Sequence, residues 1–180
     1  MKLGVITDGI SRDFAHALNV MDEFELTHAE LQFVGDTEVG DHSPEEIQHI
    51  KTLADQHNIA ISCISRHNFG GLSIMDVEPE SDIFQTHLAA FRRTIDMAKA
   101  LDTNLVRIMS GSKEMILFGS HGAEVWNVSN GAWDRFLKLM EYPVKIAEEE
   151  NITLVVETGN NSMITSGFLG RKFIDDIGSK

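Results

Sequence analysis

The sequence has few of the features that mark secreted or membrane proteins. Cys63 is the only cysteine, so no intrachain disulfide can form, which is typical of a reducing compartment. No apolar run approaches the roughly 20 residues that a membrane span needs. The apolar run at the start is too short for the core of a signal peptide. We therefore expect a cytoplasmic protein with no membrane partner.

Positive charge is also scarce. Fifteen Lys and Arg residues stand against 28 Asp and Glu, a formal net charge of −13. A chain this acidic is poorly suited to a phosphate backbone, so we expect no nucleic-acid partner. The first predicted strand is followed by TDGIS at 7–11, with one glycine, so the glycine-rich loops of nucleotide-binding proteins are missing. A small ligand, with divalent cations as companions, fits this composition better.

What the sequence does contain is a regular alternation of apolar runs and helical patterns. Five short apolar runs predict strands at residues 2–7, 29–34, 59–65, 104–109 and 153–157. Between and after them, helical spacing predicts helices from 14, from a cap at Ser43 followed by Pro44, over about 82–101 and 132–150, and from about 165. Pro143 lies inside the fourth helical pattern and predicts a kink or a split.

Strict alternation of strands and helices predicts an α/β fold with parallel strands and right-handed crossovers. Two architectures are compatible with it: a complete five-stranded doubly wound sheet, or an incomplete (β/α)8 barrel of the TIM type. Five units in 180 residues imply roughly 290 residues for eight, so on the barrel interpretation the chain stops after its fifth unit. Open strand edges and an uncovered inner face would then cause self-association, so a homo-oligomer is expected.

Polar residues at the C-terminal ends of the predicted strands form the candidate site, because ligands bind at this edge of parallel sheets. Glu157 ends the fifth strand, where a rigid strand would present a metal ligand or general base. The alternative is a carboxylate that caps a loop or pairs with a lysine. Glu30, inside the second strand, points into a barrel or faces solvent. Arg107, in the fourth strand, either pairs with Glu30 or binds an anionic substrate group.

Two loops add candidates. His67 follows the third strand, a position that suits ligand contact, although a plain surface histidine is the commoner outcome. Residues 110–130 are long for a loop between a strand and a helix, and we expect a lid or a substrate wall there.

Three short motifs, in this order, resemble those of the sugar phosphate isomerase/epimerase family, whose members are xylose-isomerase-like TIM barrels. They are AEL at 29–31, NLVRIMSG at 104–111 and TLVVETGN at 153–160. The likeness extends over essentially all 180 residues. It implies that residues 1–180 are the N-terminal part of a single barrel domain, apparently truncated after the fifth unit.

The resemblance also implies an enzyme with a divalent metal ion (Mn, Mg, Co or Zn) at the C-terminal strand ends. Family members usually supply a Glu, an Asp, a His and a second Glu; Glu157 matches the first, and the others would lie beyond Lys180. The implied reaction isomerises or epimerises a sugar or sugar phosphate. Glu157 would be ligand and base, removing the proton next to a carbonyl to give an enediolate. Asn160 and His67 would contact the substrate, as would Glu30 and Arg107 if they face the pocket.

Two other functions stay open at this point. An apurinic-site endonuclease shares the fold, but it needs several histidine ligands from the early strands, and only His67 lies near such a position. The net charge of −13 also opposes a DNA groove. A non-catalytic carbohydrate-binding or scaffold half-barrel is the second alternative, and the missing metal ligands favour it for the chain alone.

Overall fold

The computed structural model describes residues 2–113 and 131–179, and in it five parallel strands lie side by side. Each strand pairs with the next one along the chain. The order across the sheet is β1 (Gly4–Ile6), β2 (His28–Leu31), β5 (Ala60–Ile64), β6 (Leu105–Ile108) and β7 (Thr153–Val156). All five predicted strands are confirmed, each shorter than its apolar run.

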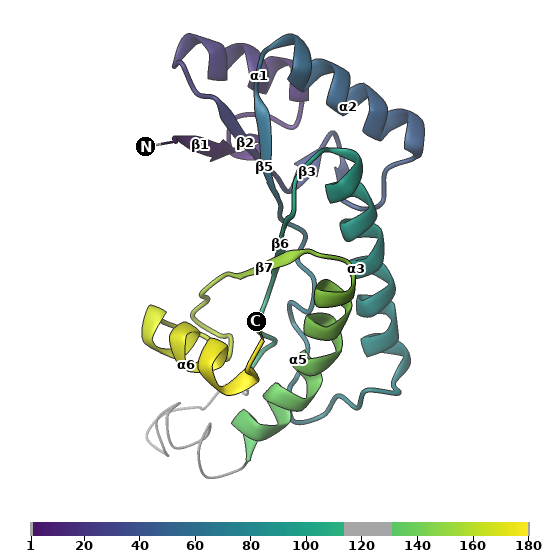
Figure 1. Ribbon diagram of the computed structural model, residues 1–180, viewed down its shortest axis with the longest axis vertical. Helices are drawn as coiled ribbons and strands as arrows, with labels where there is room; N and C mark the ends of the chain where they lie inside the picture. Colours follow the sequence, from purple (N-terminus) through teal and green to yellow (C-terminus); the bar gives the residue numbers. More distant parts are fainter. Residues whose placement is uncertain (1, 114–130, 180) are drawn as a thin grey trace.

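The helices form a layer on the outer side of this sheet. They are α1 (Phe14–Glu23), α2 (Pro44–Gln56), α3 (Asp82–Ala100), α5 (Ala132–Glu149) and α6 (Gly167–Ile177). Each of these contacts the one that follows, so the helices run in sequence around an arc (Figure 1). A doubly wound sheet needs a reversal of strand order, and the described strands show none, so that alternative is wrong. The fold is part of a βα barrel.

Local sequence signals explain where the helices begin. Ser43 accepts a hydrogen bond from the Glu46 backbone, and the Glu46 side chain returns to the Ser43 backbone, which makes the predicted capping box at α2. A short 3-10 turn, Thr7–Gly9, leads from β1 towards α1. Helix α5 continues through Pro143 as one helix, so of the predicted kink or split, the split is wrong.

The core lies between the strands and the helices. Alternate strand residues, such as Val106 and Ile108 of β6, are fully buried on the helix side. The intervening Arg107 therefore belongs to the opposite, inner face of the arc. The same alternation in β7 packs Leu154 and Val156 against the core and leaves Glu157 for the inner face. This period of two decides which side chains can form a site.

A small hairpin that the sequence pattern did not reveal follows β2. Residues 29–34 were expected to form one strand, but β2 ends at Leu31. The chain then forms β3 (Phe33–Val34), a turn at Gly35 and Asp36, and the antiparallel β4 (Thr37–Glu38). Gly35 has φ +62°, the left-handed conformation that tight hairpin turns require. This hairpin brings Glu38 to the C-terminal edge of the sheet.

None of the helices in the described ranges is long and apolar enough to cross a membrane.

Candidate functional site

Four residues form a continuous chain of polar contacts across the C-terminal edge of the sheet. Arg107, from β6, forms an ion pair with Glu157, directly after β7. A second Arg107 nitrogen, Nη2, donates to the Ser65 carbonyl at 2.5 Å. The Ser65 hydroxyl in turn donates to Glu30 in β2. The contacts therefore link β2, β5, β6 and β7 at one edge.

Arg107 is the buried centre of this arrangement. Its side chain is only 7% exposed, whereas that of Glu157 is 46% exposed. Its Nε is also buried and has no hydrogen-bond partner among the described residues. A buried guanidinium keeps its charge, so it needs a carboxylate nearby. The arginine thus holds one carboxylate oxygen of Glu157 and leaves much of that side chain accessible.

The structure brings together three of the predicted residues in a way that the sequence could not specify. The ion-pair partner of Arg107 is Glu157, not Glu30. Ser65 lies between Arg107 and Glu30 and contacts both. Ser65 was missed, although it is polar and stands at the end of the third predicted strand, like Glu157 at the end of the fifth. Ser65 is completely buried, and its carbonyl and hydroxyl groups connect Arg107 to Glu30.

Cys63 lies beside this chain of contacts. Its Sγ is 3.5 Å from the Ser65 hydroxyl, and the residue is buried. Burial raises the pKa of the Cys63 thiol, and the Ser65 hydroxyl lowers it by a smaller amount. A neutral buried thiol is a poor nucleophile, so Cys63 serves as a small packing residue.

His67 lies in a second cluster at the same edge. Its Nδ1 is 2.8 Å from Glu38 Oε1, and its Nε2 is 3.1 Å from the amide nitrogen of Gln32. The imidazole ring is half-exposed, and its centroid is 6.3 Å from that of Phe33. Gln32 and Glu38 were not singled out from the sequence. Their roles depend on the hairpin, for which the apolar pattern carries no signal.

The remaining predicted features are less connected. Asn160 is exposed in the segment after β7 and makes no side-chain hydrogen bond within the described residues. The segment expected to be a lid, 110–130, falls mostly on residues 114–130, which lie outside the described residues.

A divalent metal ion is implied by the sequence resemblance, but the described residues do not provide a site for it. Within residues 2–113 and 131–179, no three His, Cys, Asp or Glu side chains are placed to share an ion. Glu157 contributes one carboxylate, and Arg107 holds it. One carboxylate cannot define an octahedral or tetrahedral site. The described part of the chain therefore does not fit a complete metal centre.

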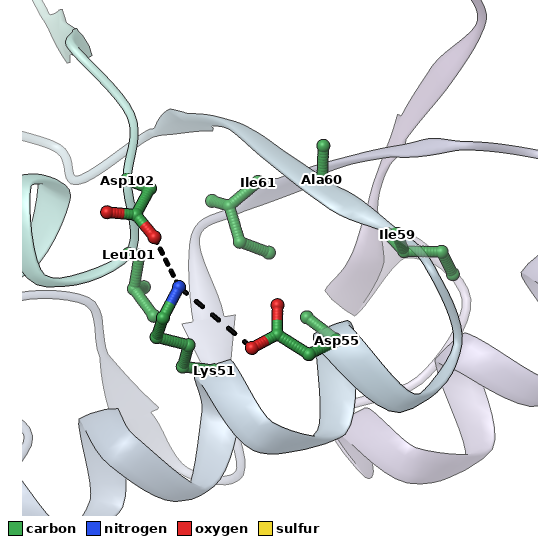
Figure 2. A pocket seen from close by; sticks show the side chains of 8 residues that line it. Lys51, Asp55, Ile59, Ala60, Ile61, Leu101 and Asp102 are labelled. Atoms are coloured by element: carbon green, nitrogen blue, oxygen red, sulfur yellow. Dashed lines mark hydrogen bonds and ion pairs between the residues drawn. The ribbon is translucent and has the colours of Figure 1, made fainter.

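A cavity of about 170 Å³ lies at the opposite, amino-terminal end of β5. Figure 2 shows Lys51 of α2 pointing between two carboxylates, Asp55 and Asp102. Both carboxylates form ion pairs with the lysine, and Asp102 belongs to the turn before β6. The contacts therefore tie α2 to that turn, and the cavity is not part of the candidate site.

Comparison with known proteins supports the barrel interpretation. No curated protein matches the sequence. A structure of a probable 3-DHS dehydratase from Bacillus anthracis is similar, with a TM-score of 0.72 and 14% identity over 99% of this chain and 60% of that one. D-Psicose 3-epimerase from Clostridium cellulolyticum, solved with D-tagatose, has a TM-score of 0.69 and 16% identity over 98% of this chain and 60% of the other.

A third similar structure was solved with magnesium. It is a xylose isomerase-like TIM barrel protein from Mycobacterium smegmatis, with a TM-score of 0.59 and 20% identity over 93% of this chain and 53% of that one. The chain therefore spans only 53–60% of the length of these three proteins. Residues 13–180 match one protein family throughout. With its sequential parallel strands, the chain belongs to the xylose isomerase-like TIM barrel family.

Proposed function

We propose that this chain is the N-terminal part of an enzyme that isomerises or epimerises a sugar or sugar phosphate. The observation that carries the proposal is the position of Glu157. It stands at the C-terminal end of β7, on the inner side of the arc, with one oxygen held by buried Arg107. Active sites of TIM barrels lie at this end of the strands.

The proposed reaction is a proton transfer next to a carbonyl group. The Glu157 carboxylate takes the proton from the carbon beside the substrate carbonyl, and the electrons of the C–H bond move onto the carbonyl oxygen to form an enediolate. Return of the proton from Glu157 to the other carbon, with a shift of the hydroxyl proton between the two oxygens, gives an isomer. An epimer requires a second acid, from outside the described residues, to protonate the opposite face of the enediolate. Arg107 orients the Glu157 carboxylate while it removes the proton. His67 supplies a substrate contact, and Asn160 supplies another from its exposed loop.

In this proposal Glu157 is also one ligand of a divalent ion, and the ion's other ligands come from outside the described residues. When bound, such an ion would polarise the oxygens of the keto-sugar. The magnesium found in the Mycobacterium smegmatis protein supports this part of the proposal.

Solvent exchange offers the sharpest test, because it detects proton abstraction without requiring turnover. The full-length protein that includes this chain is incubated with D-tagatose and Mn²⁺ in deuterated water, and loss of the sugar proton next to the carbonyl is followed by proton NMR. We expect exchange with the wild type and none with Glu157→Gln. A matched control is Glu150→Gln, which removes a carboxylate paired with Lys99 at the end of α5, away from the site. Exchange that survives in Glu157→Gln would exclude Glu157 as the base.

A non-catalytic scaffold or carbohydrate-binding half-barrel is the second candidate. The lack of a three-ligand metal cluster in the described ranges favours it. Calorimetric titration with Mn²⁺ separates the two candidates. Binding that is lost in Glu157→Gln and retained in Glu150→Gln supports the enzyme, whereas indifference of the wild type to Mn²⁺ supports the half-barrel.

A further inference from the structure

We propose that Glu38 is a positioning residue that selects which nitrogen of His67 faces a ligand. The inference rests on the proposed function only for the identity of that ligand, a sugar hydroxyl group. Neither Glu38 nor its hairpin is part of the proton-transfer machinery built around Glu157. The two clusters share the C-terminal edge, and among the described residues no hydrogen bond joins them directly.

The neighbours of His67 define its protonation pattern. An ionised carboxylate only accepts hydrogen bonds, so the nitrogen 2.8 Å from Glu38 Oε1, Nδ1, carries the proton. The amide nitrogen of Gln32 donates, so Nε2, 3.1 Å from it, presents a lone pair. Both contacts agree on the neutral Nδ1–H tautomer. Free neutral histidine prefers the opposite tautomer, with the proton on Nε2, so the surroundings impose the choice.

Glu38 is held firmly enough to impose it. Its Oε1 also accepts the backbone N–H of His67 at 3.0 Å, and its Oε2 lies 3.2 Å from Arg66 Nη2. The other terminal nitrogen of Arg66 donates to the Val39 carbonyl at 2.8 Å, next to Glu38 in the chain. The Glu38 side chain is 21% exposed and that of His67 is 49% exposed. The Nδ1 side of the ring therefore faces a sheltered carboxylate, while about half of the His67 side chain is open to solvent.

The Nε2 side of the ring has the chemistry of a hydroxyl-binding site. The Nε2 lone pair accepts one hydrogen bond, and the Gln32 amide beside it donates one. A hydroxyl group both donates and accepts, so it can replace the hydrogen bond between Gln32 and Nε2 once the Gln32 side chain moves aside, and satisfy both groups. The Phe33 ring, whose centroid is 6.3 Å from that of His67, has the Arg12 guanidinium over it at 4.7 Å and adds an apolar surface beside the pair. This combination of groups suits a polyhydroxylated ligand.

Nitrogen NMR of the imidazole reads the tautomer directly and needs no ligand. Spectra of ¹⁵N-labelled protein are recorded in alkaline solution. In the wild type, we expect Nδ1 to appear protonated and Nε2 unprotonated. Glu38→Gln, which is almost the same size, replaces the obligate acceptor by an amide, and the spectrum should lose the pure Nδ1–H pattern and move towards the Nε2–H form.

Two further variants make the test specific. Asp41→Asn removes a neighbouring carboxylate that binds Arg66 and Arg93 but not His67, and it should leave the wild-type pattern unchanged. Gln32→Met removes the donor to Nε2, and the pattern should again persist, because Glu38 remains. This variant tests the proposal even if Glu38→Gln does not fold.

Three results would overturn the role of Glu38: an Nε2–H pattern in the wild type, an unchanged pattern in folded Glu38→Gln, or a switched pattern in Gln32→Met. The ligand is tested separately with D-tagatose, which should shift the Nε2 signal in the wild type and less so in Glu38→Gln. An intact tautomer with no response to the ketose would overturn the assignment of a sugar, and with it support for the proposed function, but not the role of Glu38.

Discussion

The ion pair between Arg107 and Glu157 is buried on one side only, and this predicts unequal costs for removing its two partners. Glu157→Leu leaves the 7%-exposed guanidinium without its carboxylate. Breaking a buried pair in this way costs about 3–5 kcal/mol. Because Arg107 still donates to the Ser65 carbonyl, we expect a value at the lower end, about 3 kcal/mol.

Arg107→Met has a different effect. It leaves the Ser65 carbonyl without this donor, which costs about 1–3 kcal/mol for a buried acceptor. The 46%-exposed Glu157 carboxylate is then solvated by water, which adds at most about 1 kcal/mol. The double variant leaves only the unmade hydrogen bond, about 2 kcal/mol. The double variant should therefore be more stable than Glu157→Leu alone.

Urea denaturation followed by far-UV circular dichroism measures all four proteins, provided that the m-values agree. The cost of the unmade hydrogen bond cancels in the double-mutant cycle, so the expected coupling between the two sites is about 3–4 kcal/mol. Additive effects, or a Glu157→Leu variant as stable as the wild type, would refute the buried ion pair as the centre of the site.

Two further predictions concern backbone and pH. We expect Gly111→Ala to destabilise the protein more than Gly35→Ala, with a difference of roughly 1–3 kcal/mol in the free energy of thermal or urea unfolding. Both glycines have left-handed φ, but only at Gly111 would the new Cβ lie 2.3 Å from Ile74 Cδ1. Equal losses in the two variants would contradict this. His87 accepts the Phe69 N–H through Nδ1, and burial lowers the pKa of His87. As the pH falls, His87 is protonated at a higher pH in the unfolded chain than in the folded protein. The stability that neutral His87 contributes is therefore lost as the pH falls below about 6.5, by at most about 1.4 kcal/mol per pH unit. The stability of His87→Gln should depend less on pH in that range, and an identical pH profile would show that His87 does not titrate there.

Much of the fold follows from local sequence patterns. The five strands and the starts of the helices depend on short apolar runs and on capping residues such as Ser43, whose effects act within a few residues. The hairpin at Phe33–Glu38 was missed because an apolar run does not show where a chain leaves its sheet. The choice between a barrel arc and a doubly wound sheet also required the strand order, which depends on contacts between distant segments.

Local sequence patterns were enough to identify which polar residues stand at the C-terminal strand ends, because strand periodicity and strand boundaries are local properties. They therefore placed Glu157, Arg107 and His67 at one edge. Their partners became known only from the folded chain: Arg107 pairs with Glu157, and His67 pairs with Glu38. These pairings join residues far apart in the chain, and they depend on strand register and on the docking of a hairpin, which are set when the whole core packs.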